Sequence, residues 1–81
     1  KHYSNNLITF SNMNIENALY DFIVSNNIAT EEEINLVTSI HGYNKKELYS
    51  IIYARTGYNS YEQLLDDGYQ GTDELNEYYD I

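Results

Sequence analysis

The amino-acid sequence predicts an all-α protein: a compact bundle of about four short helices with an N-terminal extended arm and an acidic C-terminal tail. Three phrases, beginning at Thr30, Asn44 and Ser60, place a capping side chain three residues before Glu or Gln. This spacing is typical of a capping box, in which the cap and the third helical residue satisfy each other's backbone amides. Each apolar run that follows ends at a glycine, and the 81 residues contain no proline, as suits a mostly helical chain.

The first part of the chain, residues 1–12, is polar except for an apolar patch at Leu7, Ile8 and Phe10. We expect an extended arm here, because a single strand would have no partner with which to form a sheet. The helical domain then occupies residues 13–68.

The first expected helix runs from about Met13 to Ser25, with Asn12 or Asn14 as its cap. Its apolar side chains fall at the spacing of one helical face, which predicts the side that packs on the core. These side chains are Ile15, Ala18, Leu19, Phe22 and Ile23.

The second expected helix starts after the Thr30 cap and runs to about His41, before Gly42. Acidic residues fill its first turn, where they complement the positive end of the helix dipole. We expect this helix to bury Ile34, Val37 and Ile40, with Leu36 partly buried.

Two further helices are expected, from Lys45 to Thr56 before Gly57, and from Tyr61 to Asp67 before Gly68. The longer one presents an apolar face at helical spacing, whereas the shorter one depends on two leucines. The side chains expected to face inward are Leu48, Ile51 and Ile52 in the first of these helices and Leu64 and Leu65 in the second.

The final part, residues 69–81, has little periodicity. We expect an acidic, aromatic and marginally ordered tail that becomes ordered on a partner. Thr72 nevertheless begins a phrase that is able to cap one more helical turn.

Charge is the strongest global feature of the chain. Thirteen acidic residues oppose four basic ones, a formal net charge of −9. Residues 57–81 hold seven acidic and no basic residues, a charge of −7, whereas residues 1–56 carry only −2. Binding to a phosphate backbone needs lysine and arginine, so we expect no direct nucleic-acid ligand and instead a basic protein partner.

Several other classes of function lack the residues they require. The chain has no cysteine, so disulfide and thiolate chemistry are excluded, and no apolar run approaches the ~18 residues of a membrane span. Neither His2 nor His41 belongs to a recognisable catalytic arrangement. We therefore expect a cytoplasmic protein with no enzymatic activity, no cofactor and no metal site.

One partial metal-binding pattern occurs near the C-terminus. Asp66, Gly71 and Glu77 match positions 1, 6 and 12 of an EF-hand calcium loop. Position 3, however, is Gly68, where an oxygen ligand is required, and position 8 is the charged Asp73. We interpret the match as a chance pattern in an acidic segment.

The candidate binding surface combines the acidic residues with interleaved tyrosines. Carboxylates spaced like phosphates, with flat aromatic rings between them, are suited to compete for a basic nucleic-acid-binding groove, and tyrosine is common at interfaces. A solvated acidic face with tyrosines filling a small core is the other interpretation of the same pattern. The predicted partner-binding residues are Glu62, Asp66, Asp67, Asp73, Glu74, Glu77, Asp80, Tyr61, Tyr69, Tyr78 and Tyr79.

Two alternative functions remain open. The first is a helical protein–protein interaction or regulatory module that meets its partner through an apolar helix face rather than through charge. The second is helix-turn-helix-like DNA binding by the two helices around Gly42, with Lys45, Lys46 and Arg55 on the second of them.

A resemblance adds a more specific expectation. This short, acidic, cysteine-free chain is rich in Asn, Ile and Tyr, and includes the segment from Ile51 to Tyr58 followed by Tyr61-Glu62-Gln63. It resembles the small anti-defence proteins of phages and mobile elements in low-GC bacteria, which include anti-CRISPR and antirestriction proteins that mimic DNA. The resemblance implies an inhibitor, in the bacterial host cytoplasm, that occupies the DNA-binding groove of a Cas effector or another nuclease. It assigns no role to individual residues, and the oligomeric state stays undetermined.

Overall fold

The computed structural model describes residues 14–81, which form five α-helices and no β-strand. The all-α prediction is confirmed. The predicted arm, residues 1–12, and the first residue of the predicted helical domain lie outside the described residues. The helices are α2 (Ile15–Ser25), α3 (Glu31–His41), α4 (Lys45–Thr56), α5 (Tyr61–Asp66) and α6 (Asp73–Tyr78).

Each helix begins at a residue whose side chain accepts a backbone amide from the first turn. At Thr30 the predicted capping box is complete: Thr30 Oγ1 accepts from the Glu33 amide at 3.1 Å, and Glu33 Oε1 accepts from the Thr30 amide at 2.9 Å. These caps satisfy amides that have no partner within the helix itself. The five capping residues are Asn14, Thr30, Asn44, Ser60 and Thr72.

The predicted C-terminal ends of the first four helices agree with the structure to within one residue. Gly57 follows α4 with a φ of +83°, the left-handed conformation that glycine adopts without a steric penalty, and its amide donates to the carbonyl group of Tyr53. Helix α5 ends at Asp66, one residue earlier than expected, and Asp67 caps it.

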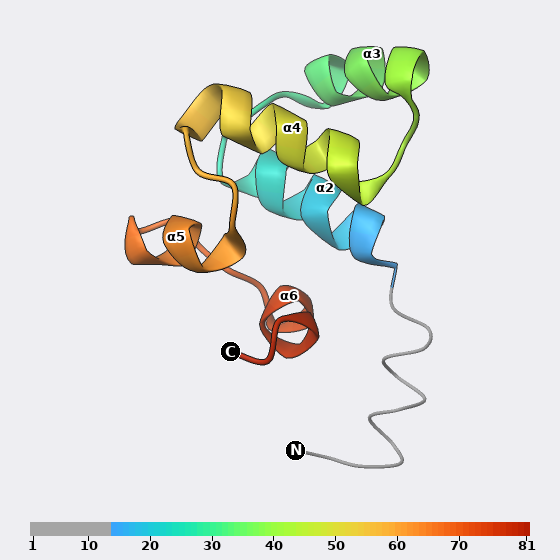
Figure 1. Ribbon diagram of the computed structural model, residues 1–81. Coiled ribbons are helices and arrows are strands. Elements are labelled where there is room, and N and C mark those ends of the chain that lie inside the picture. The colour runs from blue at the N-terminus through green and yellow to red at the C-terminus, as the bar shows by residue number, and fades with distance from the viewer. Residues whose placement is uncertain (1–13) are drawn as a thin grey trace.

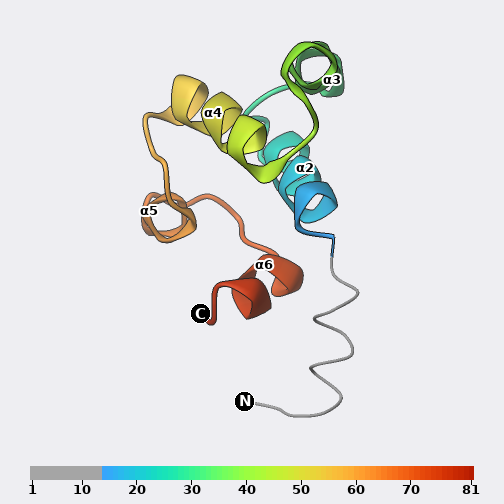
Figure 2. The ribbon, with the colours of Figure 1, turned by 45° about the vertical axis from the view of Figure 1, so that its right-hand side comes forward.

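Helices α2 and α4 pack against each other at the centre of the molecule, with α3 against α4 and α6 against α2 (Figure 1). Turning the molecule by 45° shows α3 at one end and α5 and α6 together at the other (Figure 2). Two hydrogen bonds join the end of α2 to the loop between α5 and α6. In these bonds the Asn26 side chain donates to the Gln70 carbonyl at 3.0 Å and accepts from the Gln70 amide at 2.7 Å.

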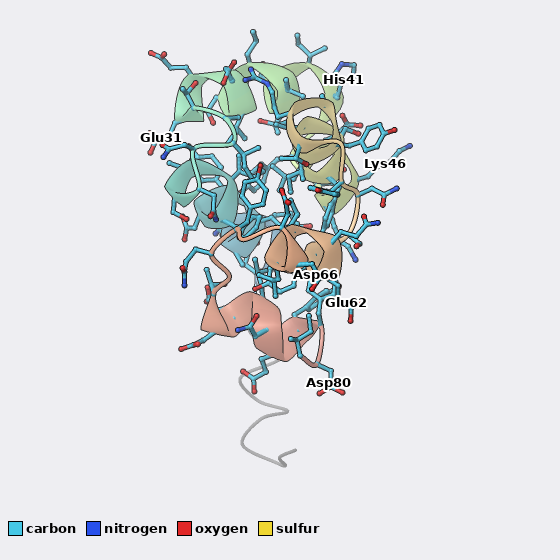
Figure 3. All side chains as sticks on the ribbon, turned by 90° about the vertical axis from the view of Figure 1, so that its left-hand side faces the viewer. Glu31, His41, Lys46, Glu62, Asp66 and Asp80 are labelled. Atoms are coloured by element: carbon cyan, nitrogen blue, oxygen red, sulfur yellow. The ribbon has the colours of Figure 1, made fainter. Side chains whose placement is uncertain are left out.

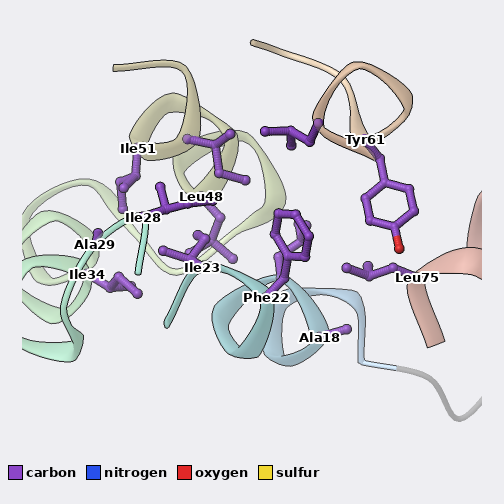
Figure 4. Packing of buried hydrophobic residues seen from close by; sticks show 13 residues of the cluster. Ala18, Phe22, Ile23, Ile28, Ala29, Ile34, Leu48, Ile51, Tyr61 and Leu75 are labelled. Atoms are coloured by element: carbon purple, nitrogen blue, oxygen red, sulfur yellow. The ribbon is translucent and has the colours of Figure 1, made fainter. Parts of the chain in front are cut away.

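The core lies between these helices, and every helix contributes at least one fully buried side chain (Figure 4). The apolar face predicted for α2 packs against α4 on one side and against Leu75 of α6 on the other. The largest fully buried residues are Leu19, Phe22, Ile23, Ile34, Leu48, Ile52, Leu64 and Leu75.

The prediction of a marginally ordered tail at residues 69–81 is wrong. Residues Asp73–Tyr78 form α6, which Thr72 caps and which the fully buried Leu75 anchors against α2. A helix of six residues is too short to show a periodic apolar pattern, and it is stable only through its contacts with the rest of the protein. The capping phrase at Thr72 is the local feature of the sequence that indicates this helix.

The burial expected for α3 is also partly wrong. Ile34 is fully buried, but Ile40 is 68% exposed and Leu36 is 63% exposed. At about 100° per residue, these two side chains lie roughly 240° and 200° around the helix from Ile34, on its opposite side. Since α3 lies at the edge of the bundle and packs against α4, nothing in residues 14–81 covers this outer side.

Candidate functional site

The seven predicted carboxylates gather on α5, α6 and the residues that flank them, and we call this the acidic surface. Glu62, Asp66 and Asp80 are seen on the same side of the molecule in Figure 3. Six of the seven residues are exposed and one, Glu77, is partly buried. The acidic surface consists of Glu62, Asp66, Asp67, Asp73, Glu74, Glu77 and Asp80.

Helix geometry explains some of these carboxylates but not others. Asp73 and Glu74 lie in the first turn of α6, where a negative charge interacts favourably with the helix dipole. Asp66 and Asp67 lie at the opposite kind of position, the last residue and the C-terminal cap of α5, where the dipole favours a cation. These two acidic residues therefore cost the fold stability, on the order of a few tenths of a kcal/mol each at an exposed site.

Tyr58 lies beside this unfavourable pair. Asp67 raises the pKa of the Tyr58 hydroxyl group through its negative charge, with smaller contributions from burial and from a hydrogen bond between the two side chains. A shallow depression of about 250 Å³ is lined by Tyr58, Gln63, Asp66 and Asp67. The α5 end of the acidic surface thus combines two carboxylates with an aromatic ring.

The prediction that Tyr61 contacts a partner is wrong, because this residue belongs to the core. Its side chain is only 2% exposed, and its ring packs edge-on against Phe22 with centroids 5.6 Å apart. Its hydroxyl group donates to Asn76 Oδ1 at 2.6 Å and accepts from the Thr72 amide at 3.1 Å. Tyr61 therefore fastens α6 to α5 and so holds the acidic surface together.

The other three predicted tyrosines are half-buried. Tyr69 and Tyr79 pack against the core, and Tyr79 stacks on Tyr61 with centroids 5.2 Å apart and an angle of 21° between the rings. Tyr78 meets Tyr79 edge-on at 4.8 Å. These rings are partly structural, so only their exposed parts are available to a partner.

Sequence reasoning missed a cleft beside the acidic surface. It has a volume of about 360 Å³ and brings together α4, the start of α5 and the end of α6. Tyr49, which the sequence analysis did not single out, lines the cleft together with Glu62, one of the predicted carboxylates. We call this feature the tyrosine cleft and define it by Lys45, Tyr49, Tyr61, Glu62 and Tyr79.

A lysine and a pair of hydroxyl groups shape the tyrosine cleft. The Tyr49 and Tyr79 hydroxyl oxygens are 2.6 Å apart and share a hydrogen bond. Burial, together with this bond, raises the pKa of Tyr49 well above its ordinary value, so the side chain is neutral throughout the physiological range. Lys45 Nζ lies 5.2 Å from the ring centre of Tyr78 and 5.9 Å from that of Tyr79, which is within the range of a cation–π interaction.

A second exposed feature lies on α3, far from the acidic surface. Leu36 and Ile40 are one turn apart and both are largely exposed, as described above. Glu31 and His41, at the two ends of this helix, are both visible at the α3 end of the molecule in Figure 3. We call Leu36 and Ile40 the apolar α3 face.

The three cations considered for helix-turn-helix-like DNA binding lie in three different surroundings. Arg55 forms an ion pair with Glu33 of α3. The hydrogen bond from the Thr30 backbone amide, followed by the contact with Arg55, lowers the pKa of the Glu33 carboxyl group. Lys45 lies against the tyrosine rings, whereas Lys46 is exposed on α4. The three cations thus do not form one basic surface.

Half of the twelve-residue segment that matched a calcium loop in part is helical. Position 12, Glu77, lies within α6, and positions 8 to 11 belong to the same helix. Within residues 14–81, no group of three or more His, Asp or Glu side chains has an arrangement suited to a metal ion. No helix of this part of the chain is both long enough and apolar enough to cross a membrane.

Comparison of the chain with protein-family models, with curated proteins and with solved structures found no match to any of them.

Proposed function

We propose that this protein binds a basic protein surface through its acidic surface, and that its target is the DNA-binding groove of a nuclease such as a CRISPR-Cas effector or a restriction enzyme. The observation that carries the proposal is the pair Asp66 and Asp67. Two acidic residues at the C-terminal end of α5 oppose the helix dipole, and the hydrogen bond between Tyr58 and Asp67 offsets this cost at only one of the two positions. A requirement for negative charge on this surface accounts for both residues.

The scaffold beneath the charges supports the proposal. Leu75 is fully buried, and the Tyr61 hydroxyl group is hydrogen-bonded to the backbone amide of the α6 cap, Thr72, and to the side chain of Asn76. The carboxylates are therefore presented from helices that are already packed in the absence of a partner. A preorganised surface loses less conformational entropy on binding than a disordered tail would.

The charge of the protein supports this class of target. A groove that binds duplex DNA carries clustered lysine and arginine side chains, because each contacted phosphate must be neutralised. Residues 57–81 offer seven carboxylates and no cation that would repel such a groove. A complementary pair of surfaces of this kind accelerates association and makes it sensitive to salt.

A second candidate function rests on the apolar α3 face. Exposed leucine and isoleucine side chains one turn apart are the type of anchor that an amphipathic helix presents to a partner groove. In that case the protein is an interaction or regulatory module, and the acidic surface serves mainly solubility.

One competition experiment tests both functions. A panel of guide-loaded Cas9 and other DNA nucleases is incubated with the protein before labelled target DNA is added, and DNA binding is measured. The variant of the acidic surface, called the surface variant, replaces Asp66, Asp67, Glu74 and Glu77 with lysine. Its control replaces Glu16, Asp21, Glu31 and Glu32 with lysine, so that both variants have their formal charge raised by eight, from −9 to −1.

We expect the protein to displace DNA from at least one nuclease. The surface variant should lose this ability, and the control variant should keep most of it. Inhibition should weaken steeply as salt rises from about 50 to about 200 mM. A Leu36→Gln, Ile40→Gln variant should inhibit normally. If instead both charge variants inhibit and the Leu36→Gln, Ile40→Gln variant does not, the interaction-module function replaces the proposal.

A further inference from the structure

The amino group of Lys45, one of the residues that line the tyrosine cleft, lies close to two aromatic rings at the end of α6. Lys45 Nζ lies within 6 Å of the ring centres of both Tyr78 and Tyr79, and it donates a hydrogen bond to the Tyr78 hydroxyl group at 3.4 Å. Aromatic rings attract cations because the face of the ring carries negative electrostatic potential. The cleft thus presents this potential where α4 and the end of α6 meet.

Lys45 is held only loosely at this position. It is the first residue of α4 and is exposed, and its four-carbon side chain is flexible. Its contacts with the rings are near the outer limit of a cation–π interaction. The lysine is therefore able to swing away and leave the aromatic walls to another cation.

The walls of the cleft favour a planar cation. Tyr79 stacks on the buried Tyr61 ring, with centroids 5.2 Å apart, and this stack together with the Tyr49–Tyr79 hydrogen bond fixes the orientation of the Tyr79 ring. A guanidinium group stacks on aromatic faces and forms forked hydrogen bonds with a carboxylate, which an ammonium group does not. Glu62, which lines the same cleft, supplies that carboxylate.

The size of the cleft agrees with such a ligand. Its volume, about 360 Å³, is at the lower end of the range of small-ligand pockets and accommodates a whole arginine side chain. We propose that the tyrosine cleft is the receptor for an arginine side chain of the protein partner, which stacks on the Tyr79 ring, pairs with Glu62 and displaces Lys45. The inference extends the proposed function by naming the side chain that the partner inserts.

The test uses the full chain and a small probe, without a nuclease, so it fails or succeeds separately from the proposed function. N-acetyl-arginine amide is titrated into isotopically labelled protein, and the chemical shifts of the Tyr49, Glu62 and Tyr79 resonances are followed. N-acetyl-citrulline amide is the matched control probe, because it has nearly the same shape but no charge. We expect saturable shifts at these three residues with the arginine probe and none with the citrulline probe.

Two pairs of variants then locate the site. Lys45→Ala should increase the affinity for the arginine probe about two- to fivefold, because the competing cation is gone, whereas Lys46→Ala on the same turn should not change it. Glu62→Gln should reduce the affinity by a similar factor, whereas Glu74→Gln, an exposed acid of α6 outside the cleft, should have little effect.

The inference is overturned if the arginine and citrulline probes give equal shifts, or if the arginine shifts spread over the acidic surface without saturation. It is also overturned if Lys45→Ala leaves the affinity unchanged. The last outcome would mean that Lys45 does not occupy the position of the probe. Both Lys45→Ala and Glu62→Gln alter exposed side chains, and an unchanged thermal unfolding curve confirms that each variant is folded.

Discussion

At the scale of single residues, the Tyr61 side chain joins the core to α6 through both ring packing and hydrogen bonds. Its ring packs between Phe22 and Tyr79, and its hydroxyl group is bonded to α6 through Thr72 and Asn76. Gly71 makes room for this arrangement. A Cβ atom at Gly71 would overlap the Tyr61 hydroxyl group and would lie 2.9 Å from Leu65 Cδ2, so the backbone passes the ring where only a glycine fits.

Gly71→Ala should therefore destabilise the protein by about 1–3 kcal/mol, the usual cost of overpacking, as measured by urea unfolding. The neighbouring Gln70→Ala alters an exposed side chain and should change stability by less than about 0.5 kcal/mol. In a Tyr61→Phe background the cost of Gly71→Ala should be smaller, because the hydroxyl oxygen that the new methyl group overlaps is absent and only the close contacts with Leu65 and the Tyr61 ring remain. Equal costs in the two backgrounds would show that the contact with Tyr61 is not the cause.

At the scale of elements, α6 determines whether the acidic surface is folded. Six residues cannot sustain a helix alone, so α6 depends on the Thr72 cap, the burial of Leu75 and the contacts of Tyr79. Four of the seven carboxylates lie in α6 or directly after it. The chemistry of the surface is thus coupled to the packing of one short helix.

Leu75→Ala should cost about 2–5 kcal/mol, because it removes a fully buried side chain and leaves a cavity against α2. Hydrogen exchange should show the largest loss of protection in residues 72–81. Leu36→Ala makes the same chemical change at a largely exposed position and should cost less than about 1 kcal/mol. Comparable costs for the two variants would contradict the assignment of α6 to the core.

At the scale of the whole molecule, negative charge is concentrated at one end. The α5 and α6 end carries all seven carboxylates of residues 57–81, whereas Lys45, Lys46 and Arg55 belong to α4. Like charges held close together repel one another, and this repulsion opposes folding unless salt screens it. The basic partner we propose would relieve the same repulsion on binding.

Raising NaCl from about 50 to about 500 mM should therefore increase the melting temperature by several degrees, since about 1 kcal/mol shifts it by about 4–8 °C in a domain of this size. Replacement of Asp66, Asp67, Glu74 and Glu77 with their amides should raise the melting temperature at low salt and flatten its dependence on salt. Thermal unfolding followed by circular dichroism measures both quantities. A salt dependence unaffected by the four replacements would mean that the repulsion lies elsewhere.

Much of this fold was predictable because its helices carry local signals. Caps at Thr30, Asn44 and Ser60 and a glycine after α3 and after α4 depend on a few adjacent residues, and the bounds of α4 were predicted without error. Burial was less predictable because it depends on neighbours distant in sequence. Ile40 is apolar and was expected in the core, yet it lies on the exposed side of α3. Tyr61 is of a type common at interfaces, yet it is buried against Phe22 and α6.

The candidate site also has one part that was predictable from the sequence and one part that was not. The carboxylates were identified from composition, since charged residues are exposed on almost any fold. The tyrosine cleft required α4, α5 and α6 to converge, and the sequence contains no local signal for that convergence beyond the tyrosines themselves. Lys45 in particular was assigned to a helix start and not to an aromatic site.

The packing of α6 against α2 also bears on how the chain folds during synthesis. About fifty residues separate Phe22 from Leu75, so the part of α2 that α6 covers emerges from the ribosome long before its cover is made. Synthesis proceeds at roughly 5–20 residues per second, which leaves this apolar surface open for several seconds. Chaperones that bind nascent chains should therefore recognise α2 until α6 has been synthesised and covers it.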